Sequence, residues 1–278
     1  MAFTKTWRTE PYGLIDPKRP EISAAGKNVI ITGGGTGIGK ATAIAFAQAG
    51  AKSVAILGRR LDRLESGAAA IKEAGKNTAV VYKAADLTIR AEADMAIQSI
   101  VDEVGKIDVF VSNAGSLPEM GEVADYDPAK LIRAFELNVL TTLNALHAFK
   151  KSASPSAVLI NISTAFSHQP PMPGVPVGAY AVSKAAGLKL VDYFGSENPD
   201  IHFVHLHPGV VETELNQSPG QNEASLPAHF SVWAASPEAK FLKGKFVWAN
   251  WDAEELLARA EDIKEKNLLA WNLNGFSS

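Results

Sequence analysis

Asn28-Val-Ile-Ile-Thr-Gly-Gly-Gly-Thr-Gly-Ile-Gly39 decides the fold, together with the Ala-rich segment from Lys40 to Gly50 that follows it. The β-branched run before the glycines is typical of a buried parallel strand, and the segment after them carries apolar residues at helical spacing. The glycines therefore lie at a strand-to-helix turn. Residues without a Cβ let backbone N–H groups approach a phosphate, and a helix N-terminus adds partial positive charge. The turn predicts a phosphate site, although glycines alone also serve ordinary tight turns.

The composition favours one large domain with a single core. The chain has 278 residues, 46% of them hydrophobic, and its net charge of −3 is not accompanied by a polybasic run. We therefore expect neither nucleic acid nor anionic membrane as a partner. The absence of cysteine excludes disulfides and thiolate chemistry and is consistent with a reducing cytosol. Without a signal-peptide pattern or a run of membrane-spanning length, a soluble cytoplasmic protein is expected.

The chain begins with a segment that differs in character from the rest. Residues 1–26 are rich in proline and charge, and Pro11, Pro17 and Pro20 block regular helix, so we expect an extended arm that wraps the domain or a partner subunit.

Residues 27–278 are expected to form one α/β domain. Further strands are predicted near Ser53–Leu57, Thr78–Lys83, Val109–Ser112, Ala157–Ile162, His202–Leu206 and Phe246–Trp248. Helices are predicted near Leu61–Ala74, Ala91–Val104, Pro128–Lys150, Ala179–Ser196 and Ser236–Leu242. This alternation predicts a Rossmann-type doubly wound parallel sheet, whose ligand site lies at the carboxyl ends of the strands.

The residues after the second strand bear on the choice of cofactor. A dinucleotide-binding fold that selects NAD usually places a carboxylate here for the ribose 2′-hydroxyl, but this chain has Gly58-Arg59-Arg60. An arginine cannot accept a hydrogen bond, whereas its planar set of donors suits a 2′-phosphate. Arg59 therefore favours NADP over NAD, unless it is simply a solvated surface residue. After the third strand, Asp86 and Leu87 are candidates for an adenine contact, and Asp86 is equally a candidate helix cap.

Two further places along the predicted rim carry unusual residues. The fourth strand ends in Asn113, Ala114 and Gly115, small residues that let backbone approach a flat ring, although any turn could use them. Asn138 lies in the middle of a predicted helix, where leucine or alanine is the better helix former. It is therefore either a functional residue or a surface asparagine.

The fifth strand leads to a candidate acid–base pair. It ends in Ser163 and Thr164, and the helix after the Pro-rich loop carries Tyr180 and Lys184 four residues apart on one face. An ammonium beside a phenol favours the phenolate, so we expect Lys184 to lower the pKa of Tyr180 toward the working pH.

These motifs together resemble the short-chain dehydrogenase/reductase family over residues 27 to about 213. The residues that carry the resemblance are Thr32-Gly33-x-Gly35-Thr36-Gly37-Ile38-Gly39, Asn113-Ala114-Gly115, Asn138, Ser163/Thr164, Tyr180-x-x-x-Lys184 and Pro208-Gly209. The resemblance implies that Tyr180 exchanges a proton with the substrate oxygen while Lys184 lowers its pKa and holds the nicotinamide ribose. It also implies that a hydroxyl at 163–164 orients the carbonyl and that Asn138 anchors a water.

The same resemblance implies a cofactor site that begins at the glycine-rich turn and ends beyond the sixth strand. It would include Gly33, Gly35, Thr36, Gly37, Ile38 and Gly39 at the turn, Tyr180 and Lys184 at the ribose, and Pro208, Gly209, Val211 and Thr213 over the nicotinamide. The segments Pro17–Ser23 and Phe246–Asp252 are similar to fungal members that act on secondary metabolites, a weaker resemblance.

The chain departs from the family pattern in two ways. Thr164 stands where the family usually has serine, and the interval to Tyr180 is longer by a Pro-rich loop at residues 169–176. The family register places Thr164 in the catalytic position, but a bulge would turn Ser163 there instead. Residues 214–235, with Pro219 and Pro227 and few periodic apolar residues, are expected to form a lid over the substrate.

The sequence thus predicts an NADP-dependent oxidoreductase that moves a hydride between nicotinamide and a carbonyl or secondary alcohol of a small, apolar or secondary-metabolite substrate. A non-catalytic NAD(P)-sensing regulator is the alternative. No metal site is expected, because His202, His205 and His207 have no cysteine or clustered carboxylate to join them.

A homodimer or homotetramer is also expected. Apolar stripes on the predicted helices Pro128–Lys150 and Ala179–Ser196 would face a symmetry mate, as the family resemblance implies, or they would face this chain's own sheet. The stripes comprise Leu131, Phe135, Leu143 and Leu146 on the first helix and Leu188, Val191 and Phe194 on the second.

Overall fold

A parallel sheet runs through the centre of the molecule. The computed structural model describes residues 3–214, 216 and 219–273. Within these residues, seven parallel strands form one sheet in the order β3-β2-β1-β4-β5-β6-β7. The strands are β1 (Asn28–Thr32), β2 (Ser53–Gly58), β3 (Ala79–Ala84), β4 (Ile107–Ser112), β5 (Ala153–Ile162), β6 (His202–His207) and β7 (Lys245–Trp248). The predicted Rossmann-type doubly wound sheet is confirmed.

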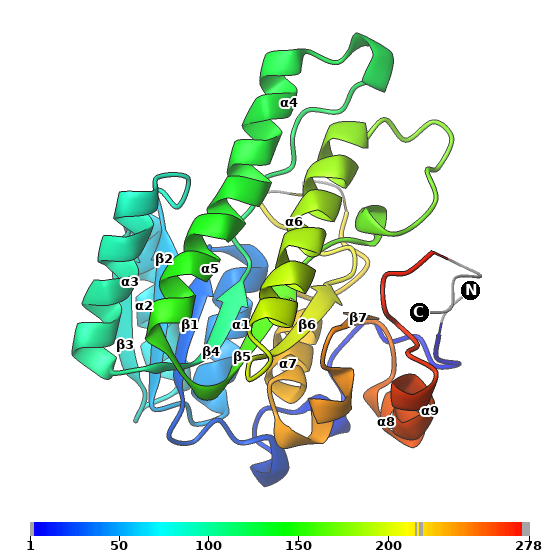
Figure 1. Ribbon diagram of the computed structural model, residues 1–278. Coiled ribbons are helices and arrows are strands. Elements are labelled where there is room, and N and C mark those ends of the chain that lie inside the picture. The colour runs from blue at the N-terminus through cyan, green and yellow to red at the C-terminus, as the bar shows by residue number, and fades with distance from the viewer. Residues whose placement is uncertain (1–2, 215, 217–218, 274–278) are drawn as a thin grey trace.

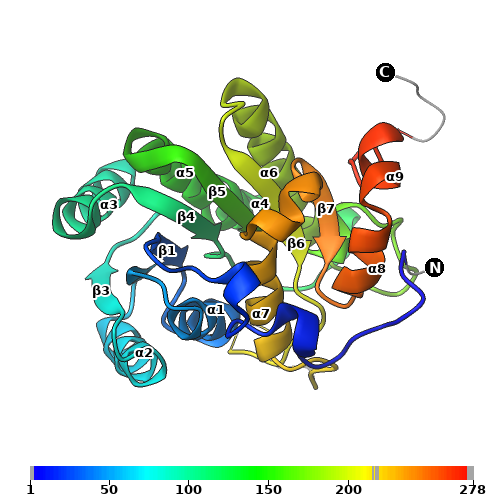
Figure 2. The same ribbon diagram turned by 90° about the horizontal axis from the view of Figure 1, so that it is seen from below.

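Helices cover both faces of this sheet (Figures 1 and 2). One face carries α1 (Gly37–Gln48), α2 (Leu61–Ala74) and α7 (Ser225–Ala234), and the other carries α3 (Arg90–Val104), α5 (Thr141–Ser152) and α6 (Gly178–Glu197). Helix α4 (Pro128–Phe135) extends beyond the sheet, and α8 (Ala253–Ala258) and α9 (Ala260–Glu265) lie beside β7. The two faces bury separate hydrophobic clusters, so the central strands are apolar on both sides.

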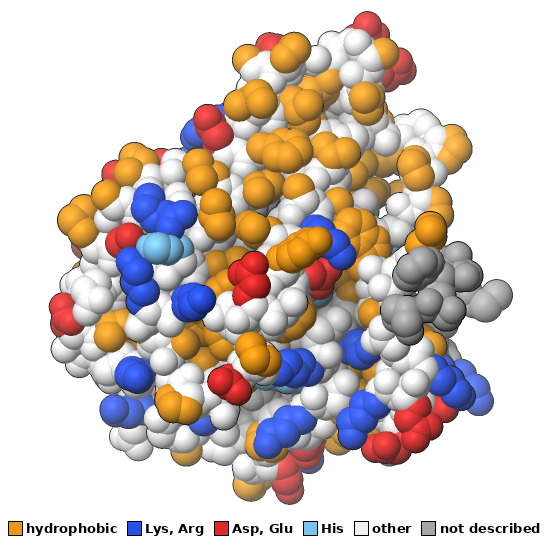
Figure 3. All heavy atoms as spheres, viewed as in Figure 1, with side chains coloured by type: hydrophobic (Ala, Val, Ile, Leu, Met, Phe, Trp, Pro, Cys, Tyr) orange, Lys and Arg blue, Asp and Glu red, His pale blue; other side chains and the backbone are white. Residues whose placement is uncertain are grey.

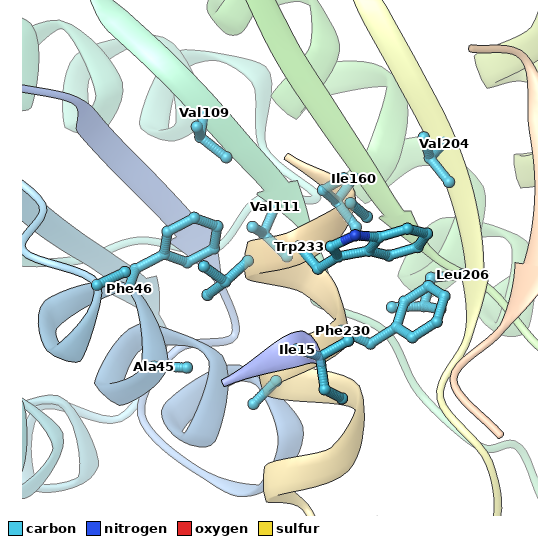
Figure 4. Close-up of a cluster of buried hydrophobic side chains, with 14 of the residues drawn as sticks. Ile15, Ala45, Phe46, Val109, Val111, Ile160, Val204, Leu206, Phe230 and Trp233 are labelled. Atoms are coloured by element: carbon cyan, nitrogen blue, oxygen red, sulfur yellow. The ribbon is translucent and has the colours of Figure 1, made fainter. Parts of the chain in front are cut away.

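The N-terminal arm packs on its own chain. Ile15 and Ile22 are fully buried, and Figure 4 shows Ile15 beside Phe230 in the cluster under β4, β5 and β6. Nearer its start, the arm lies against the C-terminal part of the chain. The backbones of Trp7 and Trp251 form an antiparallel β-bridge, and Arg8 forms an ion pair with Asp252 at 2.7 Å. These contacts place the arm against its own chain.

The predicted helix over Pro128–Lys150 is interrupted. Helix α4 ends at Phe135, a π-helical turn spans Glu136–Leu140, and α5 begins at Thr141. The hydroxyl of Thr142 donates to the carbonyl of Asn138 at 2.8 Å, and the wider turn directs the Asn138 side chain inward. Such turns inside α-helices occur frequently at functional sites.

The predicted lid over 214–235 is wrong in its second half. Residues Ser225–Ala234 form α7, whose Leu226, Phe230 and Trp233 are completely buried and which packs against α1. Figure 4 shows Trp233 and Phe230 under the sheet. A helix whose side chains form the core cannot open without unfolding it, so only residues 214–224 remain candidates for a lid, and 215, 217 and 218 lie outside the described residues.

Candidate active site

The glycine-rich turn joins β1 to α1 as predicted. Gly33 donates its N–H to the carbonyl of Leu57 at 2.7 Å, which ties the turn to the neighbouring strand β2. A Cβ on Gly39 would lie 2.3 Å from the carbonyl oxygen of Gly33, so no larger residue fits there. Gly37 opens α1 with a φ of +52°, in the left-handed region that favours glycine. The turn therefore presents backbone N–H groups and a helix N-terminus to an open cleft.

A cleft runs along the carboxyl ends of β1 to β4 and contains most of the predicted cofactor residues. Its lining includes Gly33, Gly35, Thr36, Gly37, Ile38, Gly39, Arg59, Asp86, Leu87, Asn113, Ala114, Gly115 and Thr213. The predicted residues Tyr180, Lys184, Pro208, Gly209 and Val211 are not part of this lining. Val211 is buried and pairs with Asn222, while Gly209 has a φ of +84° beside the same Asn222.

The Thr32 hydroxyl holds the two central turns of the cleft together. It accepts hydrogen bonds from the backbone N–H groups of Asn113 at 2.9 Å and Ala114 at 3.0 Å. The amide of Asn113 in turn donates to the carbonyl of Thr32 at 2.9 Å. These bonds fix the end of β4 against the end of β1, where the small residues Ala114 and Gly115 line the cleft.

Positive side chains gather at the end of the cleft beside β2. Arg59, Arg60 and Arg63 all line it, and Arg59 is exposed. Asp86 also lines this end, and its carboxylate accepts hydrogen bonds from the N–H and the hydroxyl of Thr88. Burial opposes ionisation of Asp86, but these hydrogen bonds and the charge of Arg59 lower its pKa below the usual value. Asp86 therefore both stabilises the turn before α3 and faces the cleft.

Asn138 is buried, which excludes the surface alternative. Its side-chain oxygen accepts from the N–H of Ser116 at 2.8 Å, and its amide donates to the carbonyl of Ser116 and to the hydroxyl of Ser183, both at 3.0 Å. These bonds link the segment after β4 to α6. A Cβ on Gly115 would lie 3.0 Å from the Asn138 oxygen and 3.9 Å from Lys184 Nζ, so Lys184 lies at this end of the cleft.

Lys184 is directed toward the end of β5. Its ammonium donates to the carbonyl of Ile162 at 2.7 Å. Burial lowers the pKa of Lys184 to about 8, because the charged form loses hydration.

Tyr180 and Thr164 are brought together. Burial, the larger effect, raises the pKa of the Tyr180 phenol, and the neighbouring Thr164 side chain lowers it. The expected lowering of this pKa by Lys184 is wrong for this arrangement, because desolvation of the phenol dominates and the ammonium is bonded to Ile162. The Tyr180 phenol therefore keeps its proton near neutral pH in this structure.

Ser163 has a different neighbourhood. It is buried, and its hydroxyl contacts the Ser167 hydroxyl at 3.3 Å. Ser167 also donates to the carbonyl of Thr164 at 2.6 Å, which closes a short 3-10 turn after the strand. Of the two hydroxyls, Thr164 is the one next to Tyr180, as the family register implies.

An aromatic cluster continues the rim beyond β5. Phe166 packs edge-on against Tyr180, and the indole N–H of Trp248 lies 3.1 Å from Nε2 of His168. Trp248 also contacts His207 and Trp7. We name Trp7, His168, His207 and Trp248 the aromatic cluster; it joins the N-terminal arm, the loop after β5 and the ends of β6 and β7.

The strand histidines each have other roles. His205 bonds to Asn161 and Asp192, His207 accepts from the N–H of Ala165, and burial lowers the pKa of His202 to about 4. In the part of the chain that the structure describes, no group of three or more histidine or acidic side chains could hold a metal ion. Over the same residues, no helix has the length and hydropathy that crossing a bilayer requires.

Sequence reasoning missed several cleft residues. Arg60, Arg63, Leu137, Thr141 and Glu214 all line the cleft. The sequence pattern could have predicted the two arginines, because Arg60 and Arg63 are three residues apart at the start of α2 and therefore share a face. No sequence pattern indicates Glu214, since it reaches the cleft from beyond β6.

Comparison with known proteins agrees with this geometry. The sequence profile of the short chain dehydrogenase family matches residues 27–224. A short chain dehydrogenase/reductase of Claviceps purpurea is 32% identical over 271 residues, which cover 94% of this chain and 90% of that protein. A short chain dehydrogenase of Monascus purpureus is 31% identical, with 90% of this chain and 91% of that protein covered. The relatives include several fungal enzymes, and they extend over nearly the whole chain.

Solved structures show the same architecture. A short-chain dehydrogenase/reductase from Serratia marcescens superposes with a TM-score of 0.74 at 25% identity, over 82% of this chain and 98% of that one. A short chain dehydrogenase from Burkholderia cenocepacia, solved in complex with NADP, has a TM-score of 0.74 at 22% identity over 83% and 99% of the two chains. The profile match spans most of the chain and includes every motif of the cleft. This chain belongs to the short-chain dehydrogenase/reductase family of oxidoreductases.

Proposed function

We propose that this protein is an NADP-dependent reductase that converts a carbonyl of a small, apolar or secondary-metabolite substrate to a secondary alcohol, or catalyses the reverse oxidation. The observation that carries the proposal is that Thr164 adjoins Tyr180 while Lys184 lies next to Gly115, at the end of a cleft whose opposite end carries three arginines. We therefore propose that the proton donor lies beyond the Gly115 end of the cleft and that the 2′-phosphate site lies at the arginine end.

The cleft residues fit a dinucleotide. Gly37 and Gly39 allow the backbone approach that a pyrophosphate needs, and Arg59 offers donors without an acceptor where a 2′-hydroxyl would need a carboxylate. The small residues Ala114 and Gly115 leave room for the nicotinamide at the end of the cleft opposite Arg59. We therefore propose that these residues hold NADP, with the adenosine at Arg59 and the nicotinamide toward Gly115 and Thr213.

The bound cofactor would supply or accept a hydride, and the protein would supply alignment and the proton. Tyr180, which is protonated at neutral pH, would donate that proton to the carbonyl oxygen. Thr164 would hold the same oxygen as a hydrogen-bond donor. Lys184, which lies next to Gly115, would hold the nicotinamide ribose, and Asn138 would keep Ser116 and α6 in place around the reacting groups.

Absorbance at 340 nm in the presence of NADPH and a panel of ketones, quinones and aldehydes tests this function. We expect oxidation with at least one carbonyl class and faster oxidation of NADPH than of NADH. The Tyr180→Phe variant serves as the control. Tight NADPH binding with no turnover on any member of the panel, in wild type and variant alike, would favour the sensing regulator instead.

We also propose a homo-oligomer. Ile132, Leu140, Leu143 and Val182 are exposed on α4, the π-helical turn, α5 and α6, and Figure 3 shows hydrophobic side chains gathered over α4 and α6. The expectation that the stripes face a symmetry mate is wrong for four of their residues, because Leu146, Leu188, Val191 and Phe194 are buried in this chain's own core. Light scattering at micromolar concentration tests the proposal: we expect a dimeric or tetrameric mass, which Leu143→Glu should reduce, and a monomeric wild type would contradict it.

A further inference from the structure

Glu214 connects two parts of the chain across the cleft. Its Oε2 lies 2.7 Å from Nη2 of Arg60, and its Oε1 lies 2.9 Å from Nη2 of Arg63. The carboxylate therefore uses both oxygens to hold two of the three cleft arginines. Hydrogen bonding and the charges of these arginines lower the pKa of Glu214, which remains ionised at neutral pH.

The contact lies over the glycine-rich turn. A Cβ on Gly37 would lie 3.1 Å from the Thr213 methyl group, and a Cβ on Gly35 would lie 3.1 Å from the backbone of Arg63. Thr213 and Arg63 thus lie against the glycine-rich turn, and together with Glu214 they line the cleft. An anion bound at the glycine-rich turn would therefore lie close to the two arginines that Glu214 holds.

We propose that Glu214 is an internal competitor of the cofactor 2′-phosphate and sets how strongly the enzyme prefers NADPH over NADH. The inference rests on the proposed function, because it takes Arg59 and its neighbours as the 2′-phosphate site. Arg60 and Arg63 have donors that suit either a carboxylate or a phosphate. A phosphate monoester carries close to two negative charges at neutral pH, so it can displace the single charge of Glu214 from them. NADH has a hydroxyl in that position and cannot.

The exposure of the three side chains fits an exchangeable contact. Glu214 is 44% exposed, Arg60 55% and Arg63 48%. Ion pairs at this exposure are weak and screened by salt, so a bound ligand can replace them. A buried pair would instead resist displacement. The competition therefore lowers NADPH affinity by a modest factor and leaves NADH affinity almost unchanged.

Glu214→Gln tests the proposal, since it keeps the shape of the side chain and removes its charge. Dissociation constants of NADPH and NADH are measured by quenching of tryptophan fluorescence, with no substrate and no turnover. We expect NADPH to bind about three- to tenfold more tightly, the combined worth of two exposed ion pairs, while NADH changes less than twofold. The matched control is Glu212→Gln, which makes the same change of charge two residues away, outside the cleft lining.

Arg63→Gln in the Glu214→Gln background completes the test. If Arg63 becomes a phosphate ligand when it is released, the second change removes the gain in NADPH affinity. Equal tightening of both cofactors, or no change in their ratio, overturns the competition. Arg59→Ala separates this failure from failure of the proposed function: if it abolishes NADPH preference while Glu214→Gln has no effect, only the role of Glu214 is wrong.

Discussion

The half of the rim formed by β1 to β4 is built differently from the half formed by β5 to β7. The first half uses backbone groups and small residues on short turns, such as Gly33 to Gly39 and Asn113 to Gly115. The second half uses large side chains from distant segments, with Trp7 of the arm packed on Trp248 of β7. A backbone site is fixed by local sequence, whereas a side-chain site depends on how the whole chain folds. We therefore propose that the first half holds the cofactor and that the second half contacts the substrate.

Lys184 lies where the two halves meet, so its loss should have the largest effect. Lys184→Ala removes the donor to Ile162 and the charge next to Gly115, and we expect weaker NADPH binding together with a loss of at least ~10³-fold in kcat/KM. Lys189→Ala, on an exposed part of the same helix, is the control. A loss of rate with unchanged NADPH affinity would show that Lys184 acts on the reaction and not in cofactor binding.

The two hydroxyls at the end of β5 should differ sharply. Thr164→Val keeps the shape of the side chain and removes the hydroxyl beside Tyr180, so we expect kcat/KM to fall by ~10²–10³-fold, as for one donor to a developing oxyanion. Ser163→Ala should cost little, because that hydroxyl is bonded to Ser167. Steady-state kinetics of both variants decide the matter, and the opposite ranking would move the role to Ser163.

Arg59 tests the first half alone. Arg59→Ala should weaken NADPH binding by about ten- to a hundredfold, the value of a charge-assisted pair, and should leave NADH binding and kcat nearly unchanged. Fluorescence titration with both cofactors provides the measurement. Equal or tighter NADH binding by the wild type would show that the cofactor preference is wrong.

His207 tests the stability of the second half. Burial lowers its pKa to about 3, so between pH 7 and 5 the unfolded chain takes up a proton that the folded chain does not. Lowering the pH from 7 to 5 should therefore decrease the free energy of unfolding by about 2 kcal/mol through this residue, and His207→Gln should make that decrease smaller. Urea unfolding at the two pH values measures it, with His147→Gln on the exposed face of α5 as the control. An unchanged pH dependence in His207→Gln would contradict the assignment.

The same contrast explains what could be predicted from the sequence. The turn at Gly33 to Gly39 depends on neighbouring residues, so its pattern predicts the fold and most of the cleft lining. Helix α7 was mistaken for a lid because it is buried on nearly all sides, and a helix without a polar face has no apolar period to recognise. Glu214 was missed because its partners lie about 150 residues earlier, a proximity that exists only in the folded chain.

Tyr180→Phe tests most directly the proposal that the first half of the rim holds the cofactor and the second half carries the proton donor. NADPH affinity and kcat are measured on the same preparation, by fluorescence titration and by absorbance at 340 nm. We predict that the dissociation constant of NADPH stays within a few-fold of the wild type while kcat falls by ~10²–10⁴-fold, because only the proton-transferring hydroxyl is lost. A variant that turns over at the wild-type rate would contradict the account.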